Sequence, residues 1–169
     1  MHRYVVVGLS LAAASCAGMS KSSDSSGGSA AMASGGSLQT KLDPSNEVPQ
    51  PTLGSSSPSG TATFTISGDS VSYKVTATGL TSPVTVAHIH NGPAGKAGPV
   101  VVPLNISPGS DPGTATGEGS FDASAIKATP DGTKMSMSDL LAAMRSGAAY
   151  VNVHTQNNKP GEVRGQISQ

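Results

Sequence analysis

Residues 84–95 have the sequence VTVAHIHNGPAG, an alternating strand pattern that carries two histidines and then breaks into a turn. Successive side chains of a strand point to opposite faces, so His88 and His90 leave the same face. His154 ends a second stretch of similar design, AYVNVH from Ala149, which a turn also follows. The two stretches predict two hairpins of similar design, each with histidine at the end of a strand.

Period-two alternation begins at Leu38 and recurs along the rest of the chain, interrupted by Gly, Pro, Asn and Asp, which favour turns. The predicted strands cover residues 61–66, 70–77, 84–90, 99–104, 114–121, 149–154 and 162–167. Seven or eight short strands at this spacing predict an all-β fold, a sandwich or a barrel. Trp is absent and aromatic residues are few, so Val, Ile, Leu and Ala must fill thin, sheet-based layers.

One short helix is predicted among the strands, over residues 138–147. The segment has a polar start, an acidic residue in its first turn, a basic residue in its last turn, and Gly147 where the helix should stop. Leu140, Leu141 and Met144 form a single apolar stripe. Because the helix is short and has no second apolar side, we expect this stripe to pack on the core.

Residues 1–16 are typical of a secretory signal peptide. Arg3 gives the start a positive charge, and an apolar run over residues 5–14 leads to small residues and Cys16, the only cysteine. This run is about half as long as the ~20 residues that a membrane-spanning helix needs. The small residues before Cys16 resemble a bacterial lipobox, which predicts a lipid on that cysteine. Cleavage after Ala17, which would discard the cysteine, is the alternative.

Residues 17–37 are mostly Ser, Gly and Ala and have almost nothing to bury, so they predict a flexible tether. The chain is thus expected to consist of a signal peptide (1–16), a tether (17–37) and one domain (38–169). With a lipid on Cys16, the tether would hold the domain close to a bacterial membrane at the cell envelope. Without the lipid, the protein would be secreted.

Charge and composition argue against several classes of function. The ten basic and ten acidic residues cancel, and the basic ones do not cluster, so nucleic acid is not an expected partner. The serines lie in no nucleophile elbow, and the acidic residues are scattered singly. The glycine-rich stretch 92–98 lacks the Lys-Ser/Thr ending of a phosphate-binding loop. These features predict a protein that is not an enzyme.

His88, His90 and His154 could bind one metal ion if the two hairpins lie side by side. Three imidazole nitrogens suit copper or zinc. Glu162, across the turn from His154, could add an oxygen ligand or orient a ring from outside. The alternative is a structural cluster in which polar side chains tie the hairpin turns together, namely Asn91, Asn152, Glu162 and Arg164. The distance between the rings separates the two hypotheses.

Several blocks of the sequence together resemble the CHRD family, which is named after repeats in chordin and also occurs alone in secreted bacterial proteins. In order along the chain they are NEVP from Asn46, GL from Gly79, HIHNGPAG from His88 with GPVV from Gly98, and YVNVHT from Tyr150 with PGEVRGQI from Pro160. The resemblance covers Leu38 to Gln169. It implies an extracytoplasmic, all-β Greek-key sandwich, immunoglobulin-like or superoxide-dismutase-like.

The resemblance also implies a protein of the cell envelope that acts as a non-enzymatic binding or structural module, with an extracytoplasmic protein or ligand as its partner. Copper-zinc dismutases likewise carry His-x-His on one strand. This chain departs from their pattern, because it has no further histidine in the domain to bridge two metals and no second cysteine for a disulfide. Dismutase activity is therefore not expected.

Overall fold

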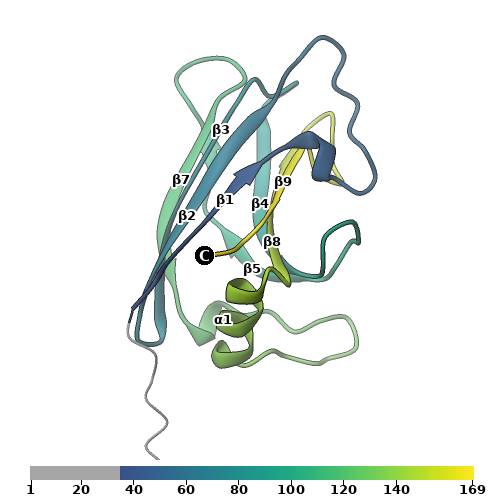
Figure 1. Cartoon of the computed structure of the whole chain (residues 1–169). Helices are drawn as coiled ribbons and strands as arrows, with labels where there is room; N and C mark the ends of the chain where they lie inside the picture. The colour runs from purple at the N-terminus through teal and green to yellow at the C-terminus, as the bar shows by residue number, and fades with distance from the viewer. Residues whose placement is uncertain (1–34) are drawn as a thin grey trace, which may run out of the picture. The chain divides into compact units, whose positions relative to one another are not determined.

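The computed structural model describes residues 35–169, which form two antiparallel sheets and one α-helix (Figure 1). The first sheet has the strand order β1-β2-β3-β7-β6, and the second has the order β5-β4-β8-β9. In the first sheet the strands are β1 (Ser37–Leu42), β2 (Ser59–Ser67), β3 (Ser70–Thr78), β7 (Ala115–Phe121) and β6 (Ser107–Pro108). In the second they are β5 (Val100–Leu104), β4 (Val84–Asn91), β8 (Ala149–Thr155) and β9 (Val163–Gln166). The all-β sandwich predicted from the sequence is confirmed.

The core lies between the sheets and is built from the alternate positions of each strand. In β2 the inward residues are Ala62, Phe64 and Ile66, all nearly fully buried, while the residues between them are exposed. Strand β3 continues the hairpin in continuous register, from Ser67 opposite Ser70 to Ser59 opposite Thr78. Burial of one face of each strand is the expected driving force for this pairing, since a slip by one residue would expose the whole apolar set.

Strand β8 differs from the others because every one of its residues is buried. Val151 and Val153 point into the core. Tyr150, Asn152 and His154 occupy the other face, and they are buried as well. The outer face of the second sheet is therefore a covered layer of polar side chains, and this layer contains the predicted site.

The helix α1 (Met137–Ser146) forms as the sequence predicts. The Ser136 hydroxyl accepts a hydrogen bond from the Asp139 amide at 3.1 Å, which caps the first turn. Gly147 ends the helix with a φ of 76°, a conformation that favours glycine. The stripe of Leu140, Leu141 and Met144 is buried in the core, which confirms its predicted role.

The structure also contains two strands, β1 and β6, that the strand predictions did not include. Strand β6 has only two residues and carries no alternation that a sequence pattern would reveal. Strand β1 pairs with β2. Two isolated bridges also link the edges of the two sheets: Gln39 of β1 pairs with Ser168, just after β9, and Asp43, just after β1, pairs with Arg164 of β9. No helix among residues 35–169 is long and apolar enough to cross a membrane.

The predicted signal peptide, Cys16 and the predicted tether as far as residue 34 lie outside the described residues. The first strand, β1, begins at Ser37. Its neighbour Gly36 already accepts a hydrogen bond from the Ile66 amide at 2.9 Å.

Candidate metal centre

The structure brings the three predicted histidines together on the outer face of the second sheet. Strands β4 and β8 are neighbours, with His88 opposite Asn152 and His154 opposite Val86. His88 Nδ1 lies 3.2 Å from His154 Nε2. One ring nitrogen from each of His88, His90 and His154 can be chosen so that all three lie within 4.8 Å of one another. The two hairpins therefore lie side by side, as a shared site requires.

His90 is held by the turn that follows its own strand. Its Nδ1 lies 2.9 Å from the carbonyl oxygen of Gly98, and a carbonyl can only accept. Nδ1 therefore carries the hydrogen, and Nε2 presents its lone pair. A Cβ at Gly98 would lie 1.9 Å from the Asn91 carbonyl oxygen, so only glycine allows this close approach. His90 Nε2 is buried and has no hydrogen-bond partner among the described residues.

His154 is oriented in the same way by a different turn. Its Nδ1 lies 2.8 Å from the carbonyl oxygen of Lys159, so Nε2 is again the nitrogen with the free lone pair. This Nε2 faces His88, whose Nδ1 must then donate the hydrogen of the 3.2 Å contact. Two of the three rings are thus fixed by backbone carbonyls, which is the usual outer support of metal-ligating histidines.

The electrostatics of the cluster favour neutral rings. Burial, together with the neighbouring His154 and His90, lowers the pKa of His88 to about 4. Burial also lowers the pKa of His90 and of His154, against the raising effect of their carbonyl partners. Neutral imidazole is the form that binds metal ions, so the rings need to release almost no protons at neutral pH.

The spacing of the nitrogens is close to that of a metal centre. Two ligands at ~2.0 Å in a tetrahedral site lie about 3.3 Å apart, and His88 Nδ1 lies 3.2 Å from His154 Nε2. His88 would bind a metal through Nδ1 in its other neutral tautomer, with the hydrogen moved from Nδ1 to Nε2. His90 would need to approach by about 1.5 Å at most to complete the set. His88 is only partly buried, which leaves a side open to solvent. Three imidazoles with an open fourth position suit zinc or copper.

Comparison with known proteins defines the family. The family model for the CHRD domain matches residues 38–167. The chain belongs to the CHRD family. The match includes all three histidines and both hairpins, and it confirms the resemblance drawn from the sequence blocks. No curated protein and no solved structure matches the chain.

Glu162 lies outside the histidine cluster of this CHRD domain. It is fully buried, and four groups donate hydrogen bonds to its two oxygens: the Thr81 amide and hydroxyl, the Thr155 hydroxyl and the Asn158 amide, at 2.5–2.8 Å. Burial alone would raise the pKa of Glu162, but these hydrogen bonds outweigh it and hold the pKa below its ordinary value. The sequence suggested that Glu162 could orient a histidine ring from outside the site. The Lys159 carbonyl does this instead, since it is the group that contacts the ring of His154.

Other polar residues of the CHRD domain tie the hairpin turns to the sheet, as the alternative hypothesis expected. Arg164 Nη2 donates to the Pro93 carbonyl at 2.9 Å, and Asn152 Nδ2 donates to the Pro160 carbonyl at 3.2 Å. These bonds and the histidine cluster occur together, so the two hypotheses do not exclude each other. Arg164 and Asn152 hold the turns in place, whereas the histidines carry the ring nitrogens that could bind a metal.

Three groups at the site were missed by the sequence interpretation. Tyr150 stacks on His90 with ring centroids 4.8 Å apart and planes at 10°, and its hydroxyl accepts from the Gly98 amide at 3.0 Å. The carbonyls of Gly98 and Lys159 orient the two fixed rings. The alternation of β8 could have placed Tyr150 on the face of His154. A backbone carbonyl leaves no comparable signal in the sequence.

Proposed function

We propose that this CHRD domain binds one copper or zinc ion through His90 Nε2, His154 Nε2 and a ring nitrogen of His88. One observation carries the proposal: His90 Nε2 is buried without a partner, on a ring whose other nitrogen is already engaged. A buried polar atom left without a hydrogen bond costs about 1–3 kcal/mol. A metal ion at the centre of the three rings would use this nitrogen and offset that cost.

The metal content of the purified chain tests the proposal. Protein prepared without chelator should carry about one copper or zinc ion per chain by mass spectrometry of the metals. His90→Gln should reduce affinity at least about tenfold in a competition with a chromogenic chelator, because only two imidazoles remain. Val86→Gln is a matched control on the same strand and face, since Val86 is exposed and lies opposite His154.

Two results would contradict the proposal. The first is a chain that takes up neither metal when copper or zinc is added in excess. The second is a His90→Gln variant that is folded and binds the metal as tightly as Val86→Gln and the unaltered chain do.

The same proposal places the domain at the cell envelope as a non-enzymatic module that binds an extracytoplasmic protein or ligand. It is supported by the signal-like pattern of residues 1–16 and by the CHRD match over residues 38–167. A lipid on Cys16 would anchor the protein to the membrane. Cys16→Ser should then move the protein from the membrane fraction to the soluble one. An unchanged distribution would rule the lipid anchor out.

A further inference from the structure

The proposed metal centre has one coordination position that the side chains around it do not fill. His90 and His154 are buried, whereas His88 is partly exposed, so the remaining position faces solvent on the His88 side. The neighbours of His88 there are Val86, two residues earlier on the same face of β4, and Pro103, opposite His88 on β5. Both are exposed, and neither side chain carries a ligand atom.

Asn152 is the other neighbour of His88, opposite it on β8, and its amide is engaged elsewhere. Its Nδ2 donates to the Pro160 carbonyl at 3.2 Å. A Cβ at Gly161 would lie 2.3 Å from Asn152 Oδ1, so this oxygen is packed against the turn that follows β8. A fourth ligand therefore has to come from outside the described part of the chain.

The three rings supply no negative charge to the ion. Burial lowers the pKa of each ring, so all three are neutral, and no carboxylate of residues 35–169 joins the cluster. A divalent copper or zinc ion would thus keep its full charge in a partly buried place. Because a charge removed from water is costly unless it is paired, an anion is favoured as the fourth ligand.

Lysines on the two turns beside the cluster point to the same ligand charge. Lys96 lies in the turn whose Gly98 carbonyl orients His90, and the carbonyl that orients His154 belongs to Lys159 itself. Both lysine side chains are exposed. They keep positive charge at the approach to the site, which attracts anions, and an ammonium group donates strong hydrogen bonds to a carboxylate.

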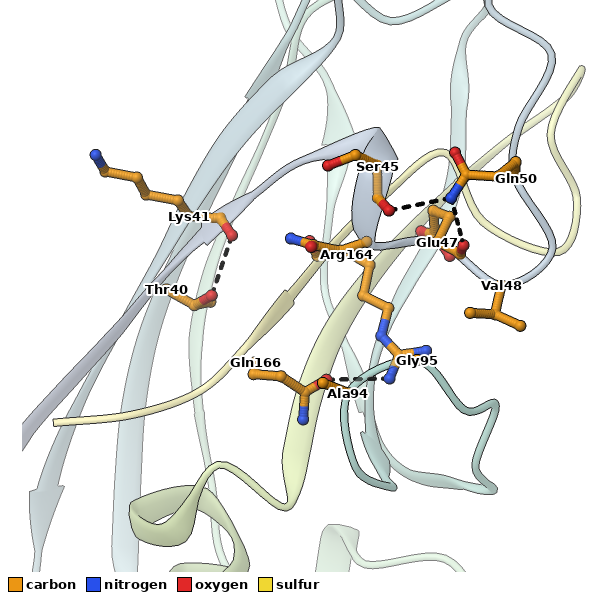
Figure 2. A pocket seen from close by; sticks show the side chains of 11 residues that line it. Thr40, Lys41, Ser45, Glu47, Val48, Gln50, Ala94, Gly95, Arg164 and Gln166 are labelled. Carbon is orange, nitrogen blue, oxygen red and sulfur yellow. Dashed lines mark hydrogen bonds between the residues drawn. The ribbon is translucent and has the colours of Figure 1, made fainter.

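Arg164 adds positive charge from the buried side of the cluster. It lines the pocket shown in Figure 2, where its Nη2 already donates hydrogen bonds to the Pro93 carbonyl and the Gln166 side chain. Its guanidinium carbon lies 3.4 Å from the centroid of the Tyr150 ring, which also stacks on His90. Burial lowers the pKa of His90, and the charge of Arg164 acts in the same direction, so this charge is felt at the cluster.

The buried acidic residues nearby leave this positive field in place. Glu162 has a lowered pKa and is ionised, but its charge is not among the influences on the pKa of the three rings. Burial raises the pKa of Glu47 to about 7, against the lowering effect of Arg164. At about pH 6, Glu47 is therefore mostly protonated, while the rings are still neutral.

We infer that the metal ion takes a small carboxylate from solution as its fourth ligand, with one oxygen on the ion and the other accepting from Lys96 or Lys159. The inference rests on the proposed metal site and names the class of ligand that this site accepts. Carboxylate oxygen is an ordinary ligand of zinc at ~2.0–2.2 Å, so it suits the same ion as the three imidazoles.

An azide titration of the purified chain loaded with Cu²⁺ tests the inference at about pH 6. Azide is a small monovalent anion whose binding to Cu²⁺ gives a new charge-transfer absorption band and a changed EPR spectrum. We expect a saturable change with a Kd of about 1 mM, and we expect acetate to displace the azide. An unchanged spectrum at about 100 mM azide, or azide that acetate at this concentration does not displace, would overturn the inference.

The copper content of the sample, measured first, separates the two proposals. A chain that binds no copper would overturn both of them. A chain that binds copper and then ignores azide and acetate would overturn only the present one, because its metal site would be real but closed to anions.

A pair of charge variants tests the role of the lysines. The double variant Lys96→Glu, Lys159→Glu should keep its copper and bind acetate about fivefold more weakly at low salt. Lys74→Glu is the control, since Lys74 is exposed on the outer face of the first sheet, and it should bind acetate as the unaltered chain does. If the double variant bound acetate as tightly as Lys74→Glu, the lysines would not hold the ligand and the inference would be wrong.

Discussion

Two buried polar clusters lie close together at the end of the β4–β8 pair, and they differ in how completely their hydrogen bonds are satisfied. In the Glu162 network, four donors surround the two carboxylate oxygens. In the histidine cluster, His90 Nε2 is sealed from solvent without a partner. A closed network needs nothing further and stabilises the fold, whereas an open one is suited to a ligand. The comparison therefore suggests a structural role for the Glu162 network and a binding role for the histidine cluster beside it.

The largest effect should come from breaking the closed network. Glu162→Gln replaces one oxygen by an amide that would face the hydroxyl and amide donors of Thr81, Thr155 and Asn158. We expect unfolding in urea to show a loss of about 3 kcal/mol, because charge-assisted hydrogen bonds are lost and buried donors are left unpaired.

Asp122→Asn is the control for this prediction. Ser124 donates two hydrogen bonds to Asp122, but the carboxylate is exposed, so water can replace them and little change is expected. If Glu162→Gln were as mild as Asp122→Asn, the distinction between the two clusters would not hold. The metal content of folded Glu162→Gln should be unaffected, since its oxygens do not contact the rings.

The next largest effect should be a dependence of stability on pH that comes from the histidine cluster. In the unfolded chain His88 takes up a proton near pH 6.5, whereas in the folded protein burial and the neighbouring rings delay this to about pH 4. Between these values the unfolded state binds more protons, so the free energy of unfolding falls as the pH drops through this window. We expect a loss on the order of 2 kcal/mol in the metal-free protein by about pH 4.

Urea unfolding at several pH values between about 7 and 4 measures this slope. His88→Gln cannot take up the proton and should give a shallower slope than the unaltered chain. An equal slope in both proteins would show that folding does not lower the pKa of His88.

Much of the fold could be predicted because alternation and turn residues report burial directly. Strands β2 and β3, whose positions were predicted, alternate between inward apolar and outward polar residues. The short β6 escaped prediction because pairing with β7, and not its own pattern, makes it a strand. The meeting of His88, His90 and His154 was a conditional prediction, since the sequence does not state that β4 pairs with β8.

The closed network around Glu162 could not be predicted in the same way. Glu162 follows a turn close to His154 in sequence, which made it a natural candidate to support the ring. Its actual donor Thr81 comes from a loop that lies 81 residues earlier in the chain. Long-range contacts of side chains with loops depend on the complete packing, and no local periodicity encodes them.

Glu47 provides an intermediate case, a buried carboxyl whose network is incomplete. Its Oε1 has no partner, and neither does the nearby Asn152 Oδ1. Burial raises the pKa of Glu47 to about 7, so between pH 4.5 and about 7 the folded state holds a proton that the unfolded state has released. Stability from this group is therefore present at low pH and lost as the pH rises, which is opposite to the histidine effect.

Glu47→Gln should accordingly stabilise the protein by about 1–2 kcal/mol at pH values above the pKa of Glu47. Gln mimics the protonated acid and can donate to an acceptor such as Asn152 Oδ1. The variant should also steepen the loss of stability toward low pH, because the opposing slope of Glu47 is removed. A destabilised Glu47→Gln protein above pH 7 would show that the carboxylate is ionised and favourably placed.

The smallest effect should come from the residue that joins the histidine cluster to the rest of the polar layer. Tyr150 stacks between His90 and Arg164, and its hydroxyl accepts from the Gly98 amide while the Gly98 carbonyl orients His90. Tyr150→Phe keeps the stack and removes only the hydroxyl, so we expect about 1 kcal/mol lower stability in urea. If the metal proposal holds, metal affinity should also fall about tenfold, because a looser turn at Gly98 no longer fixes the Nε2 lone pair of His90. A loss of stability with unchanged affinity would mean that Gly98 orients the ring without help from Tyr150.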